Sequence, residues 1–304
     1  YKIDGLVKEG EISIFKKNEL EKINFLFNIT GNNFSFRDIS FGSNNINFLS
    51  ERLNIKKDKK DYLLEGNIRN KNSPLNDQLL KIIKLKYPQF DLINTNFESE
   101  NDFLFNINNK FKVKNLKINS SILINSSQFK KNNLISEKFI QINELIDLKN
   151  HKIKASYANK KLSIEGKGQI KLQNKFEIID YKLINNGSDL NLASNIELSE
   201  LDIKNQNLIK EYLPKTKDIL NLKDHKIRAS YANKKLSIEG KGQIKLQNKF
   251  EIIDYKLINN GSDLNLASNI ELSELDIKNQ NFIKEYLPKT KDILNLKDHK
   301  IRAS

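Results

Sequence analysis

The stretch from Lys161 to Gln173, KLSIEGKGQIKLQ, alternates apolar and polar side chains without interruption. Every second residue is Leu, Ile or Gly, and the residues between them are Lys, Ser, Glu or Gln. A period of two predicts a strand with one apolar face and one solvated face. At about 3.3 Å per residue the strand would be roughly 40 Å long. Gly166 and Gly168 interrupt the apolar row, so we expect the strand to bend there.

This strand belongs to a repeat. Residues 151–224 recur at 225–298 without a gap, at a period of 74, and a third copy begins at residues 299–304. The copies differ only at Lys154/Arg228 and Leu208/Phe282. In-line copying predicts an architecture in which each unit contacts mainly its neighbours, and it argues against a closed barrel. The alternative interpretation of the second copy is a recent duplication, or an assembly error in repetitive DNA, without a selected function.

Each repeat is predicted to hold four or five strands and a short helix. The side-chain phase changes within residues 176–183, which predicts a β-bulge, and it changes again between Leu198 and Leu201. Asn186-Gly187 is a strong hairpin signal. Residues 207–213 are predicted to form the helix, which Pro214 ends.

The first half of the chain reads as strands around one helix. Residues 1–72 predict a meander of short alternating strands, and residues 89–150 predict a further β segment. Between them, residues 73–88 predict a helix, because Ser73 suits the N-cap and Pro74 the first helical position.

Composition excludes some chemistry. The 304 residues contain no Cys, so the chain can form neither a disulfide nor a thiolate site. The net charge of +14 suggests nucleic acid, but only five of the 52 basic residues are Arg, whose planar fork suits base and phosphate recognition. We therefore expect no nucleic-acid partner and regard the lysines as a solvated surface, with attraction to anionic headgroups as a weaker alternative. A start at Tyr1 and an end early in a repeat lead us to expect a fragment of a longer protein.

The apolar faces of so many strands need a cover, which a second sheet, barrel closure or an apolar ligand could supply. We predict a mainly β fold: an elongated, curled antiparallel β-sheet, open and repeat-built, with a few short helices. Its apolar side would form a hydrophobic groove that holds acyl chains. The predicted lining residues are Leu162, Ile164, Ile170, Leu172, Ile178, Leu190, Leu192, Ile196, Leu198, Leu236, Ile238, Ile244 and Leu246.

The phrase LPKTKDILNLKDHKIRASYANKKLSIEGKGQIKLQNKFEIIDYKL, together with NITGNNFSFRDISFGSNNINFLSERLNIKKDKKDYLLEGNIRN upstream, resembles the AsmA-like proteins of AT-rich alphaproteobacteria. Within that superfamily it is most similar to the YhdP type, relatives of TamB. The resemblance implies a periplasmic protein of a Gram-negative bacterium, anchored in the inner membrane by a segment outside this sequence. It also implies phospholipid transport toward the outer membrane, with outer-membrane contact, and a role in envelope integrity. The near-identical repeat departs from those relatives, whose repeats have usually diverged.

No catalytic, metal or cofactor site is predicted. His151, His225 and His299 hold the same repeat position, so they are copies of one residue, which we expect to be a strand-edge histidine. Gly166-Lys-Gly168 lacks the third glycine and the helix of a dinucleotide fingerprint. The acidic residues alternate with lysine and show no metal-ligand spacing.

Two functions from different classes follow. The first is a non-enzymatic lipid-transfer bridge segment whose groove shields phospholipid acyl chains. The second is a structural or adhesive β-repeat protein that binds a partner through its polar faces. Electrostatic binding of nucleic acid is a third and lesser reading, and it predicts a steeply salt-dependent affinity.

Overall fold

The structure is a computed structural model. The residues that it describes are 1–14, 18–58, 60–75, 92–130, 142–205, 210–211, 213, 215–261, 263–279 and 281–303.

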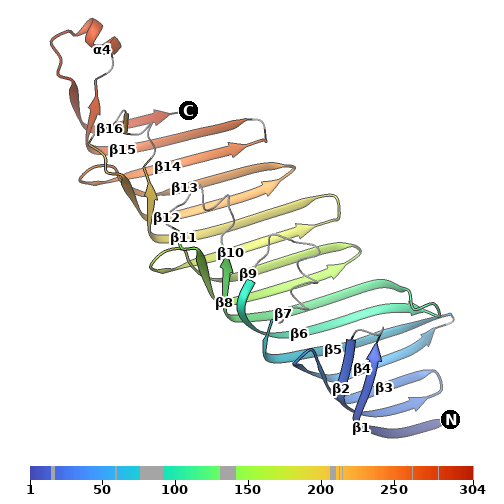
Figure 1. The fold of residues 1–304 in the computed structure, drawn as a ribbon. Helices are drawn as coiled ribbons and strands as arrows, with labels where there is room; N and C mark the ends of the chain where they lie inside the picture. Colours follow the sequence, from blue (N-terminus) through green and yellow to red (C-terminus); the bar gives the residue numbers. More distant parts are fainter. Residues whose placement is uncertain are drawn as a thin grey trace. The chain divides into compact units, whose positions relative to one another are not determined.

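Within the described residues, sixteen antiparallel strands form one open sheet, and their order in the sheet is their order in the chain (Figure 1). The predicted class, a mainly β fold built on an antiparallel sheet that does not close, is confirmed. The strands are β1 Lys2–Ile14, β2 Asn18–Thr30, β3 Asn33–Ser43, β4 Ile46–Asp58, β5 Asp61–Pro74, β6 Leu92–Asn108, β7 Val113–Lys130, β8 Leu145–Ala158, β9 Lys161–Lys171, β10 Phe176–Asn185, β11 Leu190–Lys204, β12 Ile219–Ala232, β13 Lys235–Lys245, β14 Phe250–Asn259, β15 Leu264–Lys278 and β16 Ile293–Ala303. The helix α4 spans Asn281–Tyr286.

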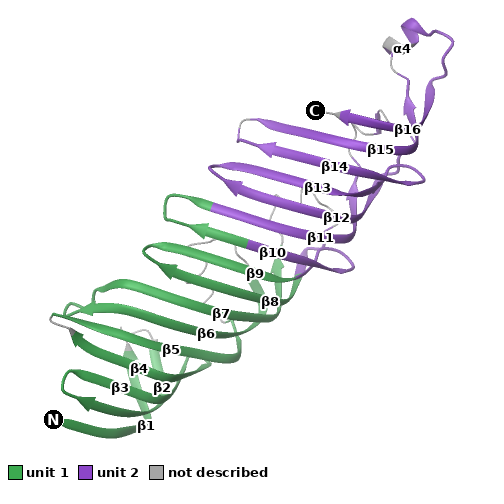
Figure 2. Cartoon of the chain, turned by 180° about the vertical axis from the view of Figure 1, so that it is seen from behind, with its two compact units in different colours: residues 1–130, 147–168, 182–190 green, residues 131–146, 169–181, 191–304 purple. Residues whose placement is uncertain are grey.

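Two compact units divide the chain (Figure 2). Unit 1 comprises Tyr1–Lys130, Asp147–Gly168 and Lys182–Leu190, and unit 2 comprises Lys131–Ile146, Gln169–Tyr181 and Asn191–Ser304. The second repeat, residues 225–298, therefore lies wholly in unit 2. Each repeat begins inside a strand, since His151 is in β8, His225 in β12 and His299 in β16.

The register separates the two faces of the sheet in unit 2. Ile238 on β13 pairs with Ala229 on β12 and with Leu257 on β14, whereas the next residue, Glu239, pairs with Arg228 and Lys256. Because directly paired residues share a face, the pattern of the sequence is carried from strand to strand. We call the side of Ile238 the apolar face and the side of Glu239 the polar face.

Many strands contain one residue with positive φ. The described strands contain nine such residues, and seven of them are Asn or Asp, the non-glycine types that most readily adopt the left-handed conformation. At Asp224 the register of β12 against β13 shifts by one residue, so that Leu222 and His225, three positions apart, both face the apolar side. Such a bulge bends the strand and increases its twist. The residues, with φ between 37° and 54°, are Glu9, Lys22, Asp38, Asn72, Asn94, Asn115, Asn150, Asp224 and Asp298.

The buried core of unit 2 lies beside this bend. Leu220, Ile244, Leu246, Leu272 and Leu275 are its buried members. Leu213, from the segment between β11 and β12, packs against them. The matching segment of the next copy lies between β15 and β16, and hydrogen bonds from one side-chain amide join its two ends. The Asn279 side chain donates to Thr290 Oγ1 and to the Lys291 carbonyl, both at 2.8 Å.

The predicted start of the helix at residues 73–88 is wrong. Ser73 and Pro74 end strand β5, where they pair with Phe97 and Asn96 of β6, and residues 76–91 lie outside the described residues. The local start signals are overridden because the ladder continues past a bulge at Asn72. Proline is tolerated at this position because the strand ends there.

The predicted helix of each repeat is confirmed in the second copy, where α4 corresponds to residues 207–212 of the first. In the first copy only Lys210 and Glu211 are described as helical, and most of the predicted segment lies outside the described residues. The hairpin turn at Asn186-Gly187 is confirmed, since Gly187 has a φ of 95°.

Candidate functional site: the apolar face

The apolar face of β11 changes from covered to open along the strand. Leu198, beside the bend, is 4% exposed, whereas Leu192, six residues earlier, is 40% exposed. Leu192 is not at the edge of the sheet, because β11 lies between β10 and β12 and Leu192 itself pairs with Tyr231. Its exposure therefore means that the described residues form no second layer over this part of the face.

The second copy shows the same gradient. On β15, Leu272 and Leu275 are buried in the core, Ile270 is half-buried, and Leu264 and Leu266 are exposed. The open half continues onto the neighbouring strands through Leu257, Ile238 and Ala229, which pair in succession from Leu266. Each repeat thus has a sealed end of its apolar face, beside the bend, and an open end.

The apolar face of unit 1 is rich in phenylalanine. Phe27 pairs with Phe36, Phe36 with Leu53, and Leu64 with Phe105. The ring centroids of Phe25 and Phe36 lie 5.4 Å apart, edge to face. None of the phenylalanines whose burial the structure describes is fully buried, and the fully buried aliphatic side chains of unit 1 are Ile46 and Leu92 among the described residues. A face this rich in aromatic rings would be buried if a second sheet packed on it.

Known proteins give no guide to this surface. Comparisons with models of protein families, with curated proteins and with solved structures find no match. The resemblance to AsmA-like proteins is therefore carried by the quoted phrases alone, and the function is argued below from the geometry.

Apart from Ile178, the predicted lining residues fall into three groups by their burial. Leu198, Ile244 and Leu246 are buried in the sealed end, and Leu190 and Leu192 are exposed. The others are half-buried: Leu162, Ile164, Ile170, Leu172, Ile196, Leu236 and Ile238. The sequence predicted a uniform lining, whereas the structure divides it, because the cover over Leu246 comes from segments far away in the chain.

The structure corrects the prediction that Ile178 lines the apolar groove. Its counterpart 74 positions on, Ile252, pairs with Gln243 and Glu271 and so lies on the polar face, and Ile178 has the same place in the burial pattern of its strand. The predicted bulge within residues 176–183 is wrong as well, since in the second copy β13 and β14 pair without a register shift. The phase change between Leu198 and Leu201 is confirmed, since both are buried.

A buried carboxylate explains the error. Glu251 takes the apolar-face position beside Ile252 and is 3% exposed. Its oxygens accept the backbone N–H of Ser273 at 2.7 Å and the Ser273 hydroxyl at 2.8 Å. Glu177 and Ser199 repeat this arrangement in the first copy. Because buried polar groups must be hydrogen-bonded, the serine at the phase change holds the glutamate in place of an apolar residue. The sequence signal was a Glu at an apolar phase, which we interpreted as a bulge.

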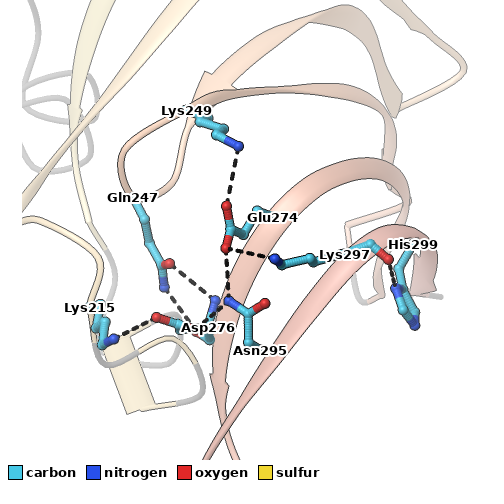
Figure 3. Close-up of polar contacts among 8 residues, drawn as sticks. All are labelled: Lys215, Gln247, Lys249, Glu274, Asp276, Asn295, Lys297 and His299. Atoms are coloured by element: carbon cyan, nitrogen blue, oxygen red, sulfur yellow. Dashed lines mark hydrogen bonds and ion pairs between the residues drawn. The ribbon is translucent and has the colours of Figure 1, made fainter.

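The polar face carries networks of hydrogen bonds and ion pairs between side chains (Figure 3). The Gln247 side-chain amide donates to the Asp276 carbonyl at 2.9 Å and accepts the Asp276 N–H at 3.1 Å, as a neighbouring strand would. The Glu274 carboxylate is 3.2 Å from Lys249 Nζ, and the hydrogen bonds from Lys249 and Asn295 lower the pKa of Glu274. These exposed pairs keep the face solvated and add little stability.

A hollow of about 910 Å³ lies on the polar face of unit 2. Two equivalent rows cross it, Asp180–Asn195–Arg228 and Asp254–Asn269–Arg302. In each row the asparagine amide donates to the aspartate at 2.7 Å. Cations and carboxylates occur in similar numbers along the hollow, so its charge selects no ligand.

The histidines were predicted to lie at strand edges, and two of the three do not. His151 and His225 are buried at the bends of β8 and β12, and only His299, on the last strand, is exposed. In the described part of the chain no group of three or more His, Asp or Glu could hold a metal ion, and no helix there is long and apolar enough to cross a membrane.

Proposed function

We propose that this chain is a segment of a non-enzymatic lipid-transfer protein that shields phospholipid acyl chains on its apolar face. In this proposal it serves phospholipid transport between inner and outer membranes, and hence envelope integrity. The protein is periplasmic and is held at the inner membrane by an anchor outside this sequence. The observation that carries the proposal is the exposure of Leu192, an apolar side chain with a strand on each side and no layer of described residues above it.

The energetics suit an acyl chain. Each buried CH₂ contributes about 0.8 kcal/mol, so a sixteen-carbon chain loses roughly 12 kcal/mol of stabilisation on entering water. A row of exposed and half-buried apolar side chains on successive strands, such as Leu266, Leu257 and Ile238, would remove most of that barrier. By binding the acyl chain, the protein would also cover its own exposed apolar surface. Exposed apolar patches of this kind mark binding sites for apolar partners. Movement along the face would be diffusion, without bond chemistry.

Photo-crosslinking tests the proposal with an internal control. Leu192 and Ile252 are about equally exposed, at 40% and 42%, but they lie on opposite faces. A photoreactive amino acid at position 192 should crosslink phospholipid in cells, and the same amino acid at position 252 should not. Equal crosslinking at both positions would show exposure without selectivity and would overturn the proposal, as would the absence of lipid at position 192 in a folded protein.

A second candidate function is that of a structural or adhesive β-repeat protein that binds a partner through its polar face. The observation that favours it is the hollow with its two equivalent Asp-Asn-Arg rows. It predicts that the purified chain carries no lipid by mass spectrometry. It also predicts that replacing Arg228 and Arg302 by Gln abolishes partner binding while crosslinking at position 192 stays absent.

A further inference from the structure

His225 is enclosed at the bend of β12. It is 1% exposed, and its Nε2 lies 2.9 Å from the carbonyl oxygen of Gln243. Because a carbonyl can only accept, Nε2 carries the ring proton of the neutral imidazole. Nδ1 is then an unprotonated nitrogen, buried and without a hydrogen-bond partner among the described residues.

The surroundings favour the neutral ring. Leu198 faces His225 from β11, Gly242 lies beneath it on β13, and the Tyr255 ring on β14 has its centroid 6.0 Å from the imidazole centroid. Tyr255 is neutral below pH 10, and burial raises its pKa further. Glu251, the other titratable group on this face of β14, already accepts two bonds from Ser273. Asp224, the preceding residue, is the nearby charge that favours a cation, but burial outweighs it and lowers the pKa of His225.

Protonation would therefore place an N–H without an acceptor, and a positive charge, inside the bend. Neither is tolerated in an apolar enclosure, so the bend must open to let water reach Nδ1. Opening would expose Leu222 and the buried Leu220, which lie just before the bulge, and so would unseal the covered end of the apolar face.

We propose that His225 is a pH-sensitive lock on the bend of strand β12, closed when the ring is neutral and released in acid. His151, which holds the same position in the first copy, is also buried and packs over Gly168. The proposal does not depend on what the apolar face holds.

His299 supplies a matched control. It occupies the same repeat position, but it is on the last strand of the sheet and is exposed. In the full chain, NMR titration should place the midpoint of the His225 imidazole below the ordinary value near pH 6.5. Loss of the signal in His225→Gln assigns it.

Hydrogen exchange provides the second readout. After correction for intrinsic rates, the opening equilibrium of the Ile227 and Gln243 amides should rise about tenfold per pH unit from about pH 6.5 down to the native midpoint of His225. His225→Gln should abolish that dependence, and His299→Gln should leave it unchanged. The proposal is overturned if the His225 imidazole titrates at the ordinary value, or if wild-type exchange at the bend does not depend on pH after that correction. Because the titration uses the wild-type chain, a poorly folded His225 variant would not rescue the proposal.

Discussion

A β-carbon added to Gly242 would lie 2.8 Å from Cα of His225 and would overlap its imidazole ring. The glycine in the middle of the strand pattern is thus the space into which the histidine packs, and the two residues specify the bend together. Gly240, two positions away, makes similar room for the Tyr255 ring, whose Cε1 would lie 2.8 Å from an added β-carbon.

Gly242→Ala is expected to destabilise the chain by about 1–3 kcal/mol, the usual cost of overpacking. Urea unfolding at neutral pH measures it. His225→Ala alone should also destabilise the fold, by loss of packing, but the double variant should lose less stability than the sum of the two because the overlap with the imidazole ring is gone, while the contact with Cα of residue 225 remains. Strict additivity in this double-mutant cycle would contradict the packing that we describe.

Removal of the buried carboxylate should lower the free energy of unfolding more than removal of an exposed ion pair does. Glu251→Ala removes a carboxylate that is 3% exposed and leaves the Ser273 N–H and hydroxyl without their acceptor, for which we expect a loss of about 1–3 kcal/mol in the free energy of unfolding. Lys249→Ala breaks an ion pair whose two side chains are about half exposed, and we expect no measurable loss in 0.15 M salt. Chemical denaturation of both variants gives the comparison, and the reverse order would contradict it.

The sequence predicted a mainly β fold, although the strands of residues 1–72, expected to be short, are 11 to 14 residues long in the structure. It also predicted an apolar face, because that face follows from local alternation. It did not predict how that face is covered. Leu246 and Leu192 look alike in the sequence, but the first is buried by segments far away in the chain and the second is not.

The errors share one physical cause, which is that tertiary pairing overrode a local rule. Ile252 is on the polar face because Glu251, with Ser273 as its partner, could be buried in its place. Ser73 has the chemistry of a helix start and lies in a strand because β6 pairs with it. The bends depend on Asp224 in the left-handed conformation, and an Asp beside His does not by itself reveal that.

Acid should destabilise the chain in two separate windows. Hydrogen bonding and charge from Lys256 lower the pKa of Glu239 below its usual 4.5. A carboxyl with a lowered pKa stabilises the fold above pH 4.5 and loses that contribution as the pH falls through its native pKa. His225, with a lowered pKa, instead favours unfolding as soon as the pH falls below about 6.5. Glu239→Gln should therefore lower the urea midpoint by a constant amount above pH 4.5, leave the slope between pH 5 and 6.5 unchanged, and reduce the slope below pH 4.5. Urea midpoints measured across pH 3 to 8 test this, and a change of slope between pH 5 and 6.5 in Glu239→Gln would contradict it.

Deletion of exactly one repeat should leave a folded protein. The strands β8 and β12 have the same length and the same burial pattern along all 14 residues. Removing residues 151–224 joins Asn150 to His225 and rebuilds β8 with a single change, Arg in place of Lys at its tenth position. The shortened chain keeps 230 of 304 residues (304 − 74). Its urea m-value should fall to about three quarters of the wild-type value, since m follows the surface exposed on unfolding, while the circular dichroism per residue stays the same.

Removing residues 152–224 instead inserts one additional histidine at the bend. Because the side-chain period is two, that slip would turn every following apolar side chain of the strand to the polar face. The 73-residue deletion should therefore be less stable and prone to aggregate, although it is one residue closer to the natural length. If both deletions behave alike, register does not hold this sheet together.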